Sequence, residues 1–262
     1  MRQKTITVEY KDRICIVTLN RPQERNAMDR EMIEDFEEAI NKIQKDQKAK
    51  VLVLTGAGRA FCAGADLKML PRWIQATPAV IEKGLLEFYR GFLRVTELPI
   101  PTVAAINGPA IGAGGCLALA CDMRIAAQEA TIGFTFIKLG INSGMGSEFF
   151  LSKLVGPART LELLMTGDIL TADEALRIGL VNKVVSSREL MDLVMKFAGK
   201  LAAMPALPIK IIKESTYAAS RSTLADVLHK EAAYQSICFQ SENVKEGIKA
   251  IRERRKPRFQ EE

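Results

Sequence analysis

The chain has 262 residues, of which 48% are hydrophobic and 26% charged, and its formal net charge is +6 at pH 7. This length and apolar content permit one large domain with a sizeable core, and no apolar run reaches the roughly 18 residues of a membrane span. Aromatic residues make up only 6% and no nucleic-acid-recognition module is visible, which argues against a nucleic-acid partner. A phosphate-bearing small ligand, or simply a solvated tail, explains the basic segment at residues 252–258 as well as nucleic acid would.

The cysteines form no C-x-x-C pair and sit in apolar surroundings. An odd set of buried-looking thiols is typical of reduced cysteines and not of a disulfide framework. We therefore expect a cytoplasmic protein in which most of these residues have packing roles. The five cysteines are Cys15, Cys62, Cys116, Cys121 and Cys238.

Strands alternate with helices in the first half of the chain. The β-branched runs 5–9 and 14–19 flank Lys11-Asp12 and predict a hairpin. Asp29 is placed to cap a helix that runs to about residue 46, with apolar positions at helical spacing. The other elements expected here are strands at 51–55, 101–106, 123–127 and 130–133, and an irregular amphipathic helical region at 67–97.

Helices dominate the second half. The segment Thr171-Ala-Asp-Glu174 has the pattern of a capping box at the start of one of them. We interpret the chain as an α/β core over residues 1–190, followed by a helical part, residues 191–262, that packs on the core or on a neighbouring subunit. The expected helices lie at 145–154, 160–165, 171–178, 190–203, 208–221, 223–239 and 243–253.

Two segments rich in small residues, 56–66 and 107–115, each follow a predicted buried strand. The second leads into residues 116–121, which predict a short, wholly buried helix. Glycine lets a ligand approach the backbone closely, and the first N–H groups of a helix lack internal partners and favour negative charge. Tight helix–strand packing is the alternative explanation. Leu117 stands where a dinucleotide fingerprint needs its third small residue, and no P-loop occurs.

Motifs spread along nearly the whole chain together resemble the crotonase (enoyl-CoA hydratase/isomerase) superfamily. The resemblance implies an α/β fold with a crotonase-like repeated ββα spiral core and a helical C-terminal trimerisation part. It also implies a homotrimer or hexamer and acyl-CoA substrates, with no metal and no cofactor besides the coenzyme A of the substrate. The motifs are Leu19-Asn-Arg-Pro22 with Asn26-Ala27, Ala60 to Leu67, Asn107 to Gly115 with Cys121-Asp122, Leu139-Gly140, and Glu246-Gly-Ile with Lys256-Pro-Arg-Phe259.

The resemblance further implies roles for individual residues. The backbone N–H groups of Ala65 and Ala113 correspond to an oxyanion hole for the thioester oxygen; the second position is usually glycine in the family. Two preorganised donors in a dry site stabilise an enolate, and one such donor is worth about 3 kcal/mol. Taken singly, the charged residues among the implied coenzyme A contacts would also fit a solvated surface. The implied contacts are Arg25, Ala27, Ala63, Asp66, Leu67, Lys68, Lys256 and Phe259.

The chain departs from the family where acids and bases are expected. The two glutamates of family hydratases correspond to Cys116 and Phe136, and a third position, acidic in some isomerases and in a dehalogenase, corresponds to Gly144. We call these three the acid positions. Acid–base catalysis needs a titratable group within hydrogen-bond reach, and a buried cysteine has a raised pKa and is usually inert. Glu148, one helical turn after Gly144, points to the same region or to the surface.

These observations predict an enzyme that acts on an acyl-CoA thioester through an enolate, as an enoyl-CoA hydratase/isomerase does. We expect a lyase or isomerase of fatty acid metabolism, but with little standard hydratase activity. Loss of carbon dioxide from a malonyl-type thioester needs no base, so an acyl-CoA decarboxylase is an alternative, and a hydrolase is another. A non-catalytic acyl-CoA-binding protein that keeps the oxyanion hole is the alternative outside enzymes.

Overall fold

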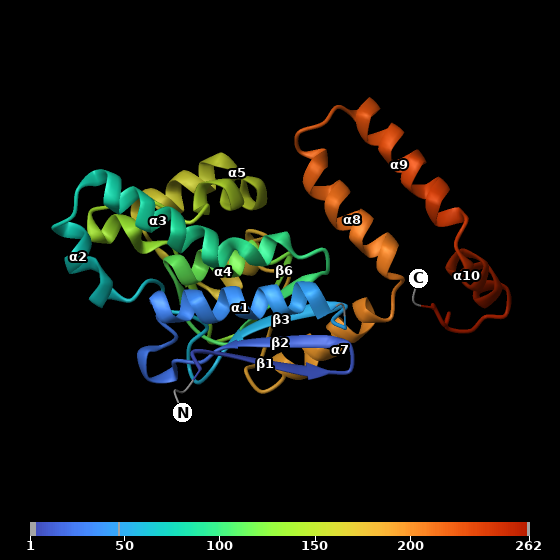
Figure 1. Ribbon diagram of the computed structural model, residues 1–262, viewed down its shortest axis with the longest axis horizontal. Coiled ribbons are helices and arrows are strands. Elements are labelled where there is room, and N and C mark those ends of the chain that lie inside the picture. Colours follow the sequence, from blue (N-terminus) through green and yellow to red (C-terminus); the bar gives the residue numbers. More distant parts are fainter. Residues whose placement is uncertain (1–3, 47, 261–262) are drawn as a thin grey trace.

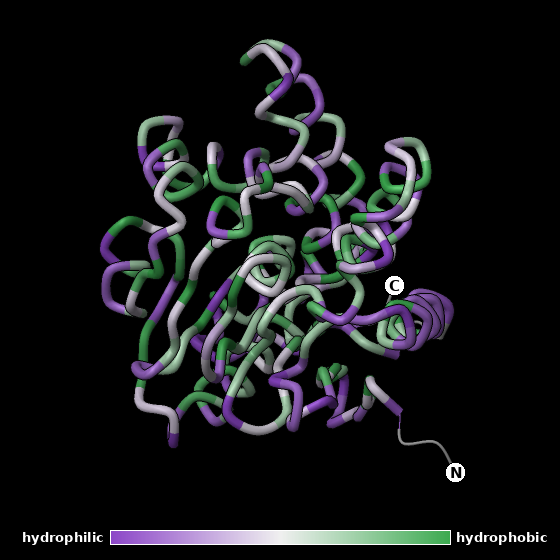
Figure 2. The backbone as a smooth tube through the Cα atoms, turned by 90° about the vertical axis from the view of Figure 1, so that its left-hand side faces the viewer, coloured by the Kyte–Doolittle hydropathy of each residue, from purple (hydrophilic) through white to green (hydrophobic). Residues whose placement is uncertain are grey.

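The computed structural model describes residues 4–46 and 48–260, so the ends of the two expected parts, 1–190 and 191–262, lie outside it. An α/β core occupies one side of the molecule, and the last helices extend from it (Figure 1). Hydrophobic segments pass through the middle of the molecule, and strongly hydrophilic ones lie at its periphery (Figure 2). Within the described residues, no helix combines the length and the apolar character needed to cross a bilayer.

A six-stranded sheet forms the centre of the core, in the order β1-β2-β3-β4-β6-β9. The first two strands pair as the expected antiparallel hairpin, and every other neighbouring pair is parallel. β3 and β4 are buried along their whole length, as parallel strands covered on both faces should be. The strands are β1 Ile6–Lys11, β2 Ile14–Leu19, β3 Val51–Gly56, β4 Thr102–Ile106, β6 Met123–Ala127 and β9 Lys183–Val185.

A second sheet of three short strands, in the order β5-β7-β8, lies beside the first. Its strands are β5 Ala110–Ile111, β7 Thr131–Gly133 and β8 Ile169–Thr171. Successive repeats give one strand to each sheet and then a helix, as in β4–β5–α4 and β6–β7–α5. This arrangement is the expected ββα spiral. β5, β8 and β9 were not predicted, because two or three residues are too few to show a periodic pattern.

Helices cover both faces of the large sheet. The Asp29 carboxylate accepts from the Met32 N–H at 2.8 Å and caps α1, as predicted. α1 packs on β1 and on α3, where the rings of Phe36 and Phe92 lie 5.4 Å apart, and α7 covers β2, β3, β4 and β6. These helices are α1 Arg30–Asp46, α3 Pro78–Leu93 and α7 Leu190–Ala202, and the short α2, Leu70–Ile74, precedes α3.

Three further helices belong to the core. α4, Ala113–Ala120, begins three residues before the expected helix at 116–121, and it is buried at every position, as predicted. The helices expected at 145–154 and 160–165 form one element, α5 Ser147–Thr166, which is interrupted at Gly156, where φ is 76°. α6, Ala172–Arg177, begins with the predicted capping box between Thr171 and Glu174.

The last three helices project away from the core (Figure 1). They are α8 Ala206–Ala219, α9 Leu224–Phe239 and α10 Glu242–Arg252, and α8 packs along α9. Asp122 holds α8 against the core, because its carboxylate pairs with Lys213 at 2.8 Å and accepts from the Tyr217 hydroxyl at 2.8 Å. Large apolar side chains remain exposed on this extension, among them Ile212, Leu224, Phe239 and Ile251.

Candidate active site

The two small-residue segments meet at the ends of β3 and β4. The N–H of Cys62 donates to Pro109 at 3.1 Å, and the N–H of Ile111 donates to Cys62 at 2.9 Å. A Cβ added at Gly114 would lie 2.3 Å from the Cys62 carbonyl oxygen, so this contact requires glycine. The small residues therefore do serve close packing, and that packing brings two stretches of bare backbone together.

The N–H groups of Ala65 and Ala113 lie at this junction. Gly64 and Asp66, on either side of Ala65, both bond to the backbone of Met28, so the Ala65 N–H points to the opposite side. Ala113 is the first residue of α4, where an N–H has no partner within the helix. A Cβ added at Gly64 would lie 3.4 Å from the Ala113 nitrogen, so the donors are neighbours. Within the described residues neither N–H donates a hydrogen bond.

Two buried amides hold the first segment in place. Asn26 is fully buried and donates to the carbonyl oxygens of Ala60 at 2.8 Å and Ala57 at 2.9 Å. Asn107 donates to Gly56 at 2.9 Å and accepts from its N–H at 3.2 Å. Both asparagines belong to the motifs in the sequence, but their roles were not predicted. Their bonds fix residues 56–60, the first half of the segment that carries Ala65, before any ligand arrives.

An ion pair between Arg21 and Asp66 lies next to the Ala65 donor and also holds this segment in place. The Arg21 guanidinium lies 3.2 Å from Asp66 and 3.2 Å from Asp29, and it also donates to the Ala27 carbonyl oxygen. The other Asp66 oxygen accepts from the Lys68 N–H at 3.0 Å. The Asp66 carboxylate, which the resemblance places on the coenzyme A side, is thus engaged within the loop itself. This role was not predicted, although Arg21 is the basic residue of the Leu19-Asn-Arg-Pro22 motif, which could have indicated it.

Most of the implied coenzyme A contacts come together along two adjacent segments. The Ala63 N–H donates to the Arg25 carbonyl oxygen at 2.9 Å, which runs residues 25–28 beside residues 63–66. The side chains of Arg25, Leu67 and Lys68 are exposed next to these segments. The residues that the fold groups in this way are Arg25, Ala27, Ala63, Asp66, Leu67 and Lys68.

The other two implied contacts lie elsewhere in this chain. Lys256 is exposed, and the Phe259 ring lies 3.8 Å from where a Cβ of Gly247 on α10 would be. α10 is at the end of the molecule opposite α2 and α3 (Figure 1). Within one chain, the fold therefore does not join these residues to the Arg25 segment.

The first acid position, Cys116, lies one helical turn beyond the Ala113 donor. Cys116 is fully buried, and its thiol lies 3.6 Å from the Gly144 carbonyl oxygen, so the first and third positions are adjacent. Burial raises the pKa of the Cys116 thiol well above its ordinary value, and the nearby Ser147 hydroxyl lowers it by less. Phe136 is half-buried and packs against the core. The Cys116 thiol thus stays protonated at neutral pH.

Three polar side chains surround these positions. Glu148 is exposed and accepts from the Ser143 hydroxyl, which ties it to the loop before α5. The buried Ser147 hydroxyl faces the Cys116 thiol without a hydrogen bond of normal geometry. The third side chain is Tyr89 from α3, which was not predicted as a site residue. Its position follows from the packing of α3 on its neighbouring helices. A Cβ added at Gly144 would lie 2.3 Å from the Tyr89 hydroxyl oxygen.

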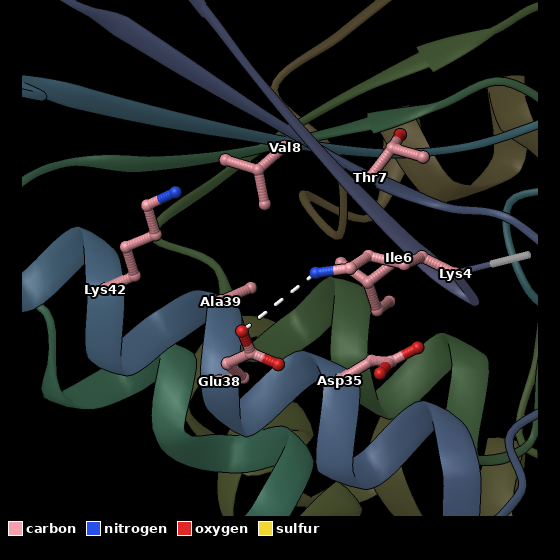
Figure 3. Close-up of a pocket in the computed structure, with 8 residues that line it drawn as sticks. All are labelled: Lys4, Ile6, Thr7, Val8, Asp35, Glu38, Ala39 and Lys42. Carbon is pink, nitrogen blue, oxygen red and sulfur yellow. Dashed lines mark ion pairs between the residues drawn. The ribbon is translucent and has the colours of Figure 1, made fainter. Parts of the chain in front are cut away.

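Surface hollows elsewhere contain none of these groups. One of about 270 Å³ lies between β1 and α1, where Lys4 pairs with Glu38 at 4.0 Å (Figure 3). Another of about 440 Å³ lies among α5, β8 and α6. In the described parts of the chain, no group of three or more His, Cys, Asp or Glu side chains is placed to hold a metal ion.

Known proteins match this chain along nearly its full length. The sequence model of the enoyl-CoA hydratase/isomerase family matches residues 9–262. A crotonyl-CoA hydratase from Syntrophomonas wolfei is 35% identical over 260 residues, which cover 99% of each chain. A 1,2-epoxyphenylacetyl-CoA isomerase from Escherichia coli is 34% identical over 249 residues, which cover 94% of each.

Solved structures agree with the sequence matches. The crystal structure of an enoyl-CoA hydratase from Bacillus anthracis has a TM-score of 0.91 and 32% identity, covering 98% of this chain and all of that one. The spiral core, the helical C-terminal part and the matched motifs are thus those of one family. The chain belongs to the enoyl-CoA hydratase/isomerase family of the crotonase superfamily.

Proposed function

We propose that the protein is an enzyme that converts an acyl-CoA thioester through an enolate whose oxygen accepts hydrogen bonds from Ala65 and Ala113. The observation that carries this proposal is the pair of adjacent backbone N–H groups without partners among the described residues. Removing a proton, adding water or losing carbon dioxide next to a thioester places charge on its oxygen. Donors held in place beforehand stabilise that charge without reorganising during the reaction.

Binding of the coenzyme A part follows from the exposed segment beside the donors. Arg25 and Lys68 offer positive charge for phosphates, and Leu67, 63% exposed, offers an apolar contact for the pantetheine arm. The named relatives act on CoA thioesters, which supports this assignment. Enzymes of this family generally need no cofactor besides the coenzyme A of the substrate, and we propose the same here.

Decarboxylation is a second candidate, and the acid positions favour it. None of Cys116, Phe136 and Gly144 supplies a carboxylate, and the Cys116 thiol is protonated. A malonyl-type thioester forms its enolate when the bond to carbon dioxide breaks and its electron pair moves toward the thioester oxygen. This step needs the two donors but no base.

Assembly into a trimer or a hexamer is part of the proposal. The exposed apolar side chains of α8–α10 would be covered by a second copy of the chain, and Lys256 and Phe259 would then lie near a neighbour's coenzyme A. Light scattering should give three or six times the 28.9 kDa of one chain. A mass of one chain in dilute solution contradicts this part of the proposal alone.

The enzymatic proposal is tested by calorimetry and turnover together. We expect calorimetric binding of propionyl-CoA, crotonyl-CoA and methylmalonyl-CoA, and product from at least one thioester in a panel that adds saturated, branched and long-chain members. The Gly64→Ala variant, in which the new Cβ would lie 2.7 Å from the Ile111 carbonyl oxygen, is the matched control with disturbed donors. Binding without any product identifies a non-catalytic acyl-CoA-binding protein, and absence of binding rejects the whole assignment.

A further inference from the structure

The Tyr89 hydroxyl occupies the space of the missing acid at position 144. A Cβ added at Gly144 would lie 2.3 Å from the Tyr89 hydroxyl oxygen and 3.0 Å from the ring carbon that carries it. Any side chain at position 144 would therefore have to displace this phenol. An oxygen from α3 thus occupies the space where a side chain at position 144 would begin.

The same hydroxyl also adjoins the first acid position. The Cys116 thiol contacts the Gly144 carbonyl oxygen at 3.6 Å, and the Tyr89 hydroxyl lies against the same glycine. Burial of the phenol raises the Tyr89 pKa. A phenol with a raised pKa keeps its proton at neutral pH, so it can donate a proton and does not serve as a base. Two of the three acid positions therefore converge on one group that holds a proton.

Packing of α3 fixes the ring and leaves the hydroxyl available. Phe88 and Phe92, on either side of Tyr89 along α3, are buried in the core, and the Phe88 ring meets the Tyr89 ring edge-on at 6.3 Å. Tyr89 itself is half-buried. Among the described residues, no hydrogen bond from its hydroxyl is found. A rigid ring with an unengaged hydroxyl is suited to meet a substrate.

The first acid position, close to the hydroxyl, lies one helical turn from the Ala113 donor. Cys116 follows Ala113 by three residues on α4, so the two lie on the same face about 4.5 Å apart along the axis. The α-carbon of a thioester is one bond away from the carbonyl carbon whose oxygen the donors hold. A group beside Cys116 is therefore placed near that α-carbon.

We propose that Tyr89 is the catalytic acid that delivers a proton to the α-carbon of the enolate. The inference rests on the proposed enolate function. With a malonyl-type thioester, the bond to carbon dioxide breaks first and its electron pair enters the enolate. The Tyr89 O–H bond then breaks, a C–H bond forms at the α-carbon and the thioester carbonyl is restored. The phenolate left behind recovers its proton from water.

Contact with the substrate is tested by fluorine NMR on protein carrying 3-fluorotyrosine. The chain has four tyrosines, and the Tyr89→Phe variant identifies the signal of Tyr89. Addition of propionyl-CoA should shift that signal and leave the signal of Tyr217, which donates to Asp122, in place. Calorimetric binding of propionyl-CoA with no shift at Tyr89 overturns the role of Tyr89 and leaves the proposed function standing.

Proton delivery is tested on the thioester that the wild type converts fastest. Tyr89→Phe keeps the ring, so the fold should survive, and kcat should fall by about 100- to 10,000-fold with KM changed less than about threefold. Tyr234→Phe is the matched control and should keep kcat within about twofold. Unchanged kcat in Tyr89→Phe overturns the inference. If the wild type converts no thioester, the proposed function itself is rejected, and the role of Tyr89 with it.

A stereochemical readout separates proton delivery from a merely structural effect. If methylmalonyl-CoA is decarboxylated in heavy water, the wild type should deuterate one face of the α-carbon of propionyl-CoA. The residual product of Tyr89→Phe should carry deuterium on both faces, because the proton then comes from bulk water. Retention of a single face in Tyr89→Phe contradicts a role for Tyr89 as the donor.

Discussion

The site has a donor half, the N–H groups of Ala65 and Ala113, and an acid half, the three acid positions, and the two halves depend on the sequence differently. The donor half uses backbone N–H groups, and Asn26, Asn107 and Arg21 fix the segment around one of them. Because the backbone donates, we expect alanine at position 113 to serve as well as the usual glycine. The acid half depends on side chains, and the family carboxylates are absent from it. The donor half should therefore tolerate changes of side chain, whereas proton transfer in the acid half depends on single residues.

The largest expected effect concerns hydration of crotonyl-CoA, which tests whether the acid half lacks the chemistry of a hydratase. A positioned acid or base contributes about 100- to 10,000-fold, so a site without both carboxylates should hydrate very slowly. The double variant Cys116→Glu/Phe136→Glu should gain measurable hydration if the donor half is intact. Loss of the ultraviolet absorbance of the conjugated thioester follows the reaction.

The matched control is Cys116→Gln/Phe136→Gln, which has the same size without acids and should stay inactive. Thermal unfolding of each variant shows whether the larger side chain at the buried Cys116 position is accommodated. Wild-type turnover at hundreds per second would contradict the comparison, because some acid–base pair would then be present after all.

The second prediction concerns a variant, Gly64→Ala, that disturbs the donor half. In Gly64→Ala the residue keeps a φ of 95°, which disfavours a side chain, and its Cβ would lie 2.7 Å from the Ile111 carbonyl oxygen. The backbone must shift, so at least one donor should be lost, and kcat should fall by about 100- to 1,000-fold. Gly199→Ala, in α7 with no atom within 4 Å of the new Cβ, should keep kcat and stabilise the fold by about 0.5–1 kcal/mol. Equal activity of the two variants would show that the Ala65 segment does not position a donor.

The third prediction compares buried thiols in the two halves at alkaline pH. Burial raises the pKa of Cys62 from 9.0 to about 12, and burial raises that of Cys116 as well. The unfolded chain releases these protons first, so the free energy of unfolding should be constant below pH 9 and fall above it, by up to about 1.4 kcal/mol per pH unit for each thiol. Urea unfolding at pH 8 and pH 10 with reductant measures this loss. Cys62→Ala should show a smaller loss, and an identical one would contradict the assignment.

Local patterns predicted much of the fold, and contacts between distant segments determined the rest. The hairpin, the Asp29 cap, the capping box at Thr171 and the buried α4 depend on neighbours in sequence. The short strands β5, β8 and β9 exist because partners pair with them, so their own residues gave no signal. The same holds in the site, where the packing of α3 on α1 and α4 brings Tyr89 to Gly144 across 55 positions of the chain. The coenzyme A contacts stay predictions, although the fold groups six of them.

The smallest expected effect concerns Glu148, the one carboxylate that sequence spacing offered to the acid half. It is exposed and its carboxylate accepts from the Ser143 hydroxyl, so it is engaged at the surface and not aimed at Cys116. Glu148→Gln keeps an acceptor for that hydroxyl and should change kcat by less than about twofold on any thioester the wild type converts. A Ser143→Ala variant controls for the hydrogen bond itself and should also be nearly neutral. If Glu148→Gln instead lowers kcat a hundredfold while Tyr89→Phe does not, Glu148 turns inward when substrate binds. Proton transfer would then depend on a carboxylate after all. The acid half would differ from that of other family members only in carrying its carboxylate one helical turn after position 144.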